Sequence, residues 1–369
     1  MGRTVIQQGR KIRVLVVDDS VVIRRLVTLA LQEDPDLEVV GSAANGLIAL
    51  QRIPQMNPDV VTLDVEMPEM DGLEALRRIR KEHPHLVVIM FSTLTSRGAT
   101  STMDALSLGA NDYVTKAANV GALEKSIAAL RQELIPKVKQ FFTPQPLAVK
   151  PSPQAPPAGQ PVERHTFHAA PFTGHRGGPK KAIVIGVSTG GPTALAEIVP
   201  LFPKNLPVPI AIVQHMPPMF TRLLAERLQL KSNIRVVEAE PGMAMEPGKA
   251  VVAPGDFHLT LKREGAKVTC VLNQEPPENS CRPAVDVMFR SALDAYGGNV
   301  VAAVLTGMGQ DGLRGVEILR AAGAYVVAQD EATSVVWGMP GAVVRAGLSD
   351  SVVGLGSIVP EIMKRLNGA

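Results

Sequence analysis

The sequence predicts an α/β protein with two doubly wound, mostly parallel sheets. Nearly continuous apolar runs alternate with segments whose apolar residues recur at helical spacing, as expected of strands covered by helices on both faces. The length of 369 residues suggests two domains rather than one. A stretch rich in Pro, Ala, Gly and Gln separates two such patterns, so each is expected to form its own domain.

Composition narrows the classes of function. A hydrophobic fraction of 46% with 20% charged residues is ordinary for a chain that buries large cores. The net charge is only +3, and no basic stripe with interleaved aromatics is present, so nucleic acid is not an expected partner. The first residues lack an apolar leader and no apolar run has the length of a membrane span. We therefore expect a cytoplasmic protein, without membrane insertion, whose Cys270 and Cys281 are free thiols.

Four segments are expected along the chain. Residues 1–9 form an N-terminal tail, and residues 10–130 form the first domain. Residues 131–180 contain the end of a helix and a Pro-rich flexible linker with few residues able to form a core. Residues 181–369 form the second domain.

The first domain reads as a five-stranded, flavodoxin-like unit. Val22, Leu26 and Leu29 recur at helical spacing directly after the first strand. Amphipathic segments also separate the later strands, which gives the strand–helix alternation of a doubly wound sheet. The predicted strands are Ile12–Val17, Leu37–Val40, Val60–Leu63, Leu86–Phe91 and Asp112–Thr115.

The second domain reads as a Rossmann-like unit with an antiparallel excursion. It begins with a strand and a Gly-rich turn, followed by a helix near Thr193–Val199. The predicted parallel strands are Ala182–Val187, Ile210–Gln214, Val300–Leu305 and Ala324–Ala328. The predicted stretch of hairpin character covers Lys249–Ala253, Phe257–Lys262 and Lys267–Leu272.

Polar side chains end most strands of the first domain. They are Asp18 and Asp19, Asp64, Ser92 and Lys116. Because the carboxyl ends of parallel strands form one crevice, these groups are expected to meet there. Clustered carboxylates suit Mg²⁺, beside which a carboxylate can accept a phosphoryl group. A lone strand-end Asp is more often a helix cap or turn residue, but the conjunction favours a site.

The first domain resembles a response-regulator receiver domain. The resemblance implies that a partner histidine kinase phosphorylates Asp64. It also implies that Asp19 and Asp64, with Asp18 in support and the backbone carbonyl of Glu66, hold Mg²⁺. The motifs that carry the resemblance are Val16–Ser20, Leu63–Gly72 and Asp112–Lys116.

The same resemblance assigns a switch. Ser92, Tyr113 and Lys116 match the switch positions, and Thr93 is the alternative to Ser92. Many receivers have Lys-Pro where this chain has Lys116-Ala117, so a cis bond is not expected after the lysine.

A second motif, Gly186–Pro192, places Ser188 between a strand and a helix. Its glycines allow a tight turn, and the helix N-terminus supplies free N–H groups for an oxyanion. The pattern G-x-S-x-G alone also fits a phosphate- or nucleotide-binding turn, or simply a tight connection.

A serine nucleophile needs a base and an orienting acid. His215 follows Ile210–Gln214, and Asp311 follows Val300–Leu305, so both belong at the same sheet edge as Ser188. The order Ser, His, Asp differs from that of α/β-hydrolases. His258 competes as the base, and Asp311 has the alternative of capping a helix near Leu313.

The second domain resembles a CheB-type chemotaxis methylesterase. The resemblance makes Ser188 the nucleophile, His215 the base and Asp311 the orienter. It places oxyanion donors at the backbone near Thr189 and at Met308. The motifs that carry it are Ile185–Pro192, Gln214–Thr221, Ala253–Asp256, Arg282–Phe289 and Leu305–Gly312.

The combined resemblance implies an activity and partners. The substrates are glutamate methyl esters and glutamines of methyl-accepting chemoreceptors, and the esterase site needs no metal or other cofactor. The unphosphorylated receiver is expected to cover the Ser188 crevice, and the chain is expected to be a monomer.

The sequence leaves two alternative classes of function, a non-catalytic binding module and a transcriptional response regulator. The second would need a basic helix-turn-helix, which the sequence lacks. A nucleotide-binding output would need an acidic residue near Pro207–Ile210, and none stands there.

Overall fold

The computed structural model describes residues 10–93, 95–116, 123–142 and 178–367. The expected tail (1–9), Ala117 and most of the expected linker lie outside the described residues. The predicted domain limits stay predictions.

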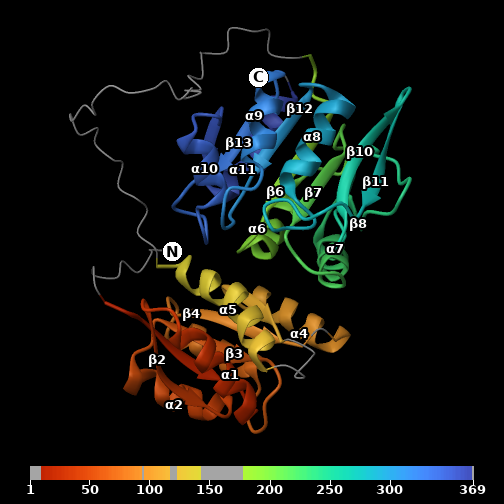
Figure 1. The fold of residues 1–369 in the computed structure, drawn as a ribbon. Coiled ribbons are helices and arrows are strands. Elements are labelled where there is room, and N and C mark those ends of the chain that lie inside the picture. The colour runs from red at the N-terminus through yellow and green to blue at the C-terminus, as the bar shows by residue number, and fades with distance from the viewer. Residues whose placement is uncertain (1–9, 94, 117–122, 143–177, 368–369) are drawn as a thin grey trace, which may run out of the picture.

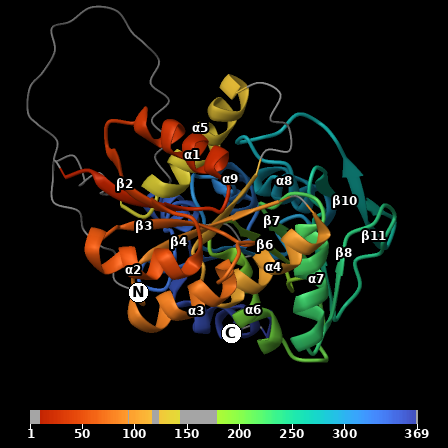
Figure 2. The same ribbon diagram turned by 90° about the horizontal axis from the view of Figure 1, so that it is seen from below.

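The first sheet has five parallel strands in the order β2-β1-β3-β4-β5. Helices α1 and α5 cover one face, and α2, α3 and α4 cover the other (Figure 2). This is the predicted doubly wound pattern. The strands are β1 (Ile12–Val17), β2 (Leu37–Ala43), β3 (Val60–Asp64), β4 (Val87–Ser92) and β5 (Asp112–Thr115). The helices are α1 (Val21–Gln32), α2 (Gly46–Met56), α3 (Gly72–Glu82), α4 (Ser96–Ser107) and α5 (Leu123–Lys139).

The second sheet has seven parallel strands in the order β14-β13-β12-β6-β7-β9-β8. The four predicted parallel strands form its centre, while β8 and β14 were not predicted. The strands are β6 (Ala182–Val187), β7 (Ile210–Gln214), β8 (Arg235–Glu238), β9 (Lys249–Val252), β12 (Val300–Val304), β13 (Tyr325–Gln329) and β14 (Ser351–Val353).

The antiparallel excursion is present but smaller than predicted. β10 (His258–Glu264) and β11 (Lys267–Asn273) form a separate antiparallel pair. The assignment of Lys249–Ala253 to this stretch was wrong, because β9 pairs in parallel with β7 and β8. All four residues of β9 are buried, as expected of a strand inside a covered parallel sheet.

Alternate residues of the central strands face opposite layers of helices. On β6, Ala182 and Val184 belong to the core beneath α8, α9 and α10, while Ile183 and Ile185 pack beneath α6, α7 and α11. The helices are α6 (Gly191–Ile198), α7 (Phe220–Lys231), α8 (Val285–Tyr296), α9 (Leu313–Ala321), α10 (Met339–Arg345) and α11 (Ile358–Leu366). Two 3₁₀ turns, η1 (Val199–Leu201) and η2 (Leu355–Ser357), complete the elements.

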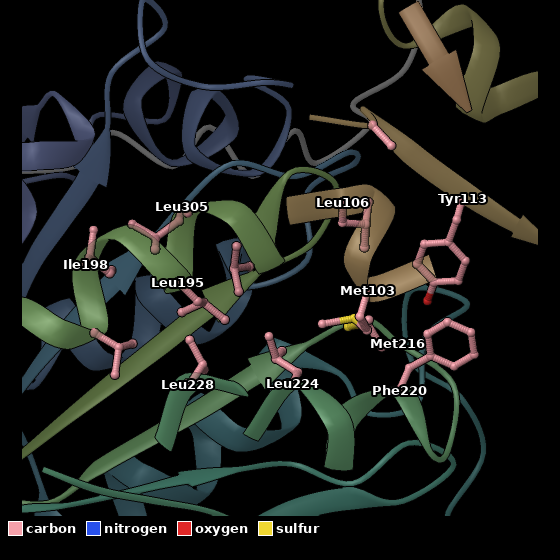
Figure 3. Packing of buried hydrophobic residues seen from close by; sticks show 14 of the residues in the cluster. Met103, Leu106, Tyr113, Leu195, Ile198, Met216, Phe220, Leu224, Leu228 and Leu305 are labelled. Atoms are coloured by element: carbon pink, nitrogen blue, oxygen red, sulfur yellow. The ribbon is translucent and has the colours of Figure 1, made fainter. Parts of the chain in front are cut away.

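The two domains meet through α4 and α5 of the first and α6 and α7 of the second (Figure 1). Buried apolar side chains run without a break across this boundary (Figure 3). The first domain therefore contributes the face beside its edge strand β5, and the second contributes the carboxyl edge of its sheet.

Candidate active site and phosphoacceptor site

The first sheet gathers its acidic strand ends as predicted. Ligand oxygens of Asp18, Asp19 and Asp64 all lie within 4.8 Å of one another. Asp18 and Asp64 are buried, whereas Asp19 is exposed. Lys116 Nζ lies 2.8 Å from an oxygen of Asp18 and 2.8 Å from one of Asp64. The Lys116 ammonium therefore pairs with two of the three clustered carboxylates, which leaves this crevice short of positive charge.

The charge deficit appears in the pKa of Asp64. Burial, and then the neighbouring Asp18, raise the pKa of Asp64 from 3.8 to about 6, although Lys116 opposes the shift. A cation would relieve this penalty, and an all-oxygen donor set with room for water is what Mg²⁺ prefers. The residues present therefore fit Mg²⁺.

The remaining predicted positions lie around this crevice. The side chain of Glu66 pairs with Arg97 at 3.4 Å, so only its backbone carbonyl stays a predicted ligand. Ser92 is buried at the end of β4, where its hydroxyl donates to the Gly98 carbonyl at 3.0 Å. Thr93 instead hydrogen-bonds Thr95, the N-cap of α4.

In the second domain, backbone constraints hold Ser188 in a tight turn. Its N–H donates to the Thr306 carbonyl, and Gly190 has a φ of 78°, a conformation that favours glycine. A Cβ at Gly191 would lie 1.9 Å from Oε1 of Gln214, so only glycine fits where α6 begins. The turn thus presents Ser188 at the carboxyl edge of β6.

Strand order brings the other predicted partners to the same edge. β6 lies between β7 and β12, so the ends of these three strands are neighbours. His215 follows β7, and its Nε2 lies 2.8 Å from Oδ2 of Asp311, which follows β12. One cavity of about 720 Å³ is lined by Ser188, His215 and Asp311 together.

The predicted nucleophile and the predicted base share this cavity without being hydrogen-bonded. Within the described part of the chain, Ser188 Oγ forms no hydrogen bond to His215. Since Nε2 faces Asp311, Nδ1 is the ring nitrogen left to receive the serine proton. Such bonds are often long in ligand-free sites and tighten when substrate binds.

The predicted oxyanion donors also line the cavity. Considering only described residues, the N–H groups of Thr189 and Met308 donate to no protein acceptor. Free N–H groups beside a serine turn are suited to stabilise an oxyanion.

His215 and Asp311 form a coupled pair. Burial of the ring lowers the pKa of His215, but the Asp311 carboxylate and the neighbouring Cys281 side chain together outweigh burial and raise it. Burial raises the pKa of Asp311, whereas His215 and the N–H groups of Val285 and Asp286 lower it overall. Asp311 therefore stays ionised and holds the imidazole by its Nε2–H.

The structure bears on two alternatives, His258 as the base and Asp311 as a helix cap. Buried His258 accepts from the Ala284 N–H at 3.3 Å through Nδ1 and contacts the Pro276 carbonyl at 3.2 Å through Nε2. Both of its nitrogens are therefore engaged in structure. Asp311 does not cap α9 at Leu313, whose N-cap is Gly312 without a side-chain cap hydrogen bond. It caps the first turn of α8 instead, because it accepts from the N–H groups of Val285 and Asp286.

Sequence reasoning missed a side chain that joins the serine and histidine loops. Gln214 is buried, and its Nε2 donates to the carbonyls of Ser188 at 3.0 Å and His215 at 3.2 Å. Its place at the last residue of β7 was the available signal. A terminal glutamine is otherwise unremarkable.

The first domain closes one side of the cavity. Asp112, Tyr113 and Lys137 contribute to its lining. Thr189, the residue after the predicted nucleophile, donates from its Oγ1 to Oδ2 of Asp112 at 3.0 Å. The Tyr113 ring stacks on Phe220 with centroids 4.9 Å apart and planes at 6° (Figure 3).

Polar contacts extend this interface along α4. Arg227 on α7 donates to Asp104 at 2.7 Å and to the Thr100 carbonyl at 3.0 Å. Thr193 donates to the Leu106 carbonyl at 3.3 Å. The predicted switch residue Tyr113 thus belongs to the surface that joins the domains.

These two sheets and their crevices define a response regulator whose output is an α/β domain with a serine-containing cavity. A model described as "Response regulator receiver domain" matches residues 14–128, and one described as "CheB methylesterase" matches residues 183–362. Each match falls on one of the two sheets.

Whole-length relatives agree with these matches. The chain is 52% identical to the protein-glutamate methylesterase/protein-glutamine glutaminase of Nocardioides sp., over 96% of this chain and 95% of that one. It is 50% identical to the protein of the same name from Trichodesmium erythraeum, over 96% of this chain and 99% of that one. The crystal structure of the Thermotoga maritima CheB methylesterase catalytic domain matches with 44% identity and a TM-score of 0.50, covering 50% of this chain and 98% of that one. The chain therefore belongs to the CheB methylesterase family, with a receiver domain at its N-terminal side.

None of the helices within the described ranges has the length and apolar character needed to cross a bilayer.

Proposed function

We propose that this chain demethylates glutamate methyl esters, and deamidates glutamines, on chemoreceptors through a Ser188-His215-Asp311 triad. The observation that carries the proposal is the 2.8 Å contact between His215 and Asp311 in the cavity that also contains Ser188. The names of the relatives support the substrate class.

Acylation begins when His215 removes the Ser188 proton through Nδ1. Ser188 Oγ forms a bond to the glutamyl δ-carbonyl, and the resulting oxyanion accepts from the N–H groups of Thr189 and Met308. His215 then passes the proton to the departing methoxide, so methanol leaves and an acyl-enzyme remains. Asp311 stabilises the imidazolium during this step.

Deacylation repeats the sequence with water as the nucleophile. His215 takes a proton from water, the new C–O bond forms, and Ser188 Oγ leaves with the proton returned by His215. The product is a glutamate side chain. A glutamine passes through the same intermediates and releases ammonia in place of methanol.

The receiver domain controls access to this site. A histidine kinase transfers a phosphoryl group to Asp64, with Lys116 and Ser92 near the phosphoryl oxygens. Asp19 and Asp64, with Asp18 in support and the Glu66 carbonyl, would hold Mg²⁺, which offsets the phosphoryl charge when bound.

The contacts between the two domains explain how the receiver would control access to the Ser188 cavity. Without phosphorylation, Asp112 and Tyr113 occupy one side of the Ser188 cavity, which excludes a receptor helix. Phosphorylation favours an arrangement in which these contacts are broken.

The test is methanol release from methyl-esterified receptor membranes by the full chain, with and without Mg²⁺ and a small phosphodonor. We expect release to rise with the phosphodonor and to vanish in Ser188→Ala. Asp64→Asn should keep the basal rate and lose the increase. Activity retained in Ser188→Ala would exclude this nucleophile.

A further inference from the structure

Asp286 is a buried carboxyl group that the reaction described above does not use. It lies in the first turn of α8 and is only 1% exposed. Its Oδ1 accepts from the Gly315 N–H at 2.7 Å, and its Oδ2 accepts from Asn279 Nδ2 at 2.9 Å. Burial is the main reason why the pKa of Asp286 is raised.

Asn279 connects this carboxyl group to the proposed triad. The same Nδ2 atom also lies 2.8 Å from Oδ1 of Asp311. An amide nitrogen carries two hydrogens, so one points to each carboxyl group. Asn279 thus separates two acids that would otherwise repel each other.

Asp311 accepts hydrogen bonds from several backbone N–H groups besides the Asn279 amide. Oδ2 accepts from Val285 N–H and faces His215, while Oδ1 accepts from the N–H groups of Asp286 and Gly312. Those backbone donors belong to helix ends and fix where the carboxylate sits. Apart from His215, Asn279 provides the side-chain donor among the described residues.

The segment that carries Asn279 is itself held in place. Glu278 and Cys281 exchange backbone hydrogen bonds of 3.1 and 2.9 Å around Asn279 and Ser280. Arg290 of α8 makes two bonds to the Glu278 carboxylate, at 2.7 and 2.5 Å. The turn is therefore tied to the helix whose N-terminus binds Asp311.

We propose that Asn279, oriented by Asp286, is a positioning residue for the hydrolysis assigned to this cavity. Its amide locks the Asp311 carboxylate so that one oxygen faces His215 Nε2–H and fixes the tautomer with Nδ1 free for Ser188. This inference rests on the proposed triad.

The plainer explanation for Asn279 is its backbone. Asn279 and Ser280 have φ values of 52° and 63°, and asparagine tolerates this region better than most residues. Glycine tolerates it as well, so Asn279→Gly keeps the turn and removes only the amide. Ser280→Gly makes the same kind of change one residue later and serves as the matched control.

The experiment compares these two variants in the full chain, treated with Mg²⁺ and phosphodonor. For Asn279→Gly we expect kcat for methanol release to fall by roughly 10- to 100-fold with KM within about twofold, the scale of one lost bond to a charged group. Ser280→Gly should match the wild type. Asp286→Asn puts a donor opposite the Asn279 donor and should reproduce the loss.

A spectroscopic readout makes the test independent of the substrate. The proton shared by His215 and Asp311 should give a downfield ¹H resonance that His215→Gln removes. We expect Asn279→Gly to shift or broaden this signal and Ser280→Gly to leave it. If the wild type releases no methanol, the proposed substrate is wrong, and the resonance alone decides the positioning role.

Two results would overturn the inference. One is an Asn279→Gly chain whose kcat and downfield resonance match those of Ser280→Gly. The other is a raised KM with unchanged kcat, which would mean that Asn279 binds substrate instead of positioning Asp311.

Discussion

The stacked pair Tyr113–Phe220 offers a direct test of the proposed restraint of the methylesterase domain by the receiver. Phe220 is fully buried at the start of α7, and its ring lies parallel to that of Tyr113 across the domain boundary (Figure 3). Phe220→Leu keeps an apolar side chain in the hydrolase core but removes the aromatic stack. The predicted switch residue Tyr113 stays intact, and the substitution leaves the phosphoacceptor crevice unchanged.

The expected size follows from the geometry. A stacked pair is worth about 0.5–1.5 kcal/mol beyond the area that it buries. Losing that energy in the closed state alone raises the open fraction by roughly 2- to 12-fold, because about 1.4 kcal/mol corresponds to a factor of ten. The unphosphorylated rate should rise by the same factor, whereas the phosphorylated rate should not change.

The assay is methanol release with and without phosphodonor, reported as the ratio of the two rates. Phe202→Leu is the control, since Phe202 is equally buried in the same domain but is not part of the stack. A Phe220→Leu ratio equal to that of the wild type would refute the latch. So would a change of both rates by one common factor, which would place the effect in catalysis.

Two further predictions concern single side chains. Burial raises the pKa of Asp64 to about 6, so lowering the pH from about 8 to about 5 protonates this carboxylate and removes one charge from the proposed metal site. Mg²⁺ affinity should therefore weaken about tenfold over this range. Calorimetric titration of the full chain with Mg²⁺ checks this, and an affinity that does not change with pH would contradict it. Gln214→Met removes the donor shared by the carbonyls of Ser188 and His215 and should lower the free energy of unfolding by about 1–3 kcal/mol, together with kcat. Urea unfolding followed by circular dichroism measures the first effect, and an unchanged midpoint would show that water replaces the amide.

Local patterns were sufficient for most of the fold. Apolar runs bounded by turn residues located all five strands of the first sheet and four strands at the centre of the second. β9 was misassigned because a four-residue buried run has no feature that separates a parallel strand from one arm of a hairpin. The short edge strands β8 and β14 carry too few residues for a periodic pattern.

In the candidate site too, local sequence patterns located some residues and missed others. Ser188, His215 and Asp311 became candidates because each follows a recognisable strand, and the ends of parallel strands converge. The resemblance to CheB-type methylesterases then favoured His215 over His258 as the base. Asn279 could not, because it lies in an irregular turn 32 residues from Asp311 in the chain. Only folding brings its amide to that carboxylate.

By itself, the sequence determined two parallel-sheet domains, an acidic crevice in one and a serine-containing edge in the other. These features depend on local alternation of apolar and polar residues, which neighbouring positions encode directly. The tertiary structure decided which surfaces of the domains meet, as with Tyr113 on Phe220 and Asp112 on Thr189. It also decided which side chains support the histidine and aspartate. Such contacts depend on packing between segments far apart in the chain, for which no local pattern is required.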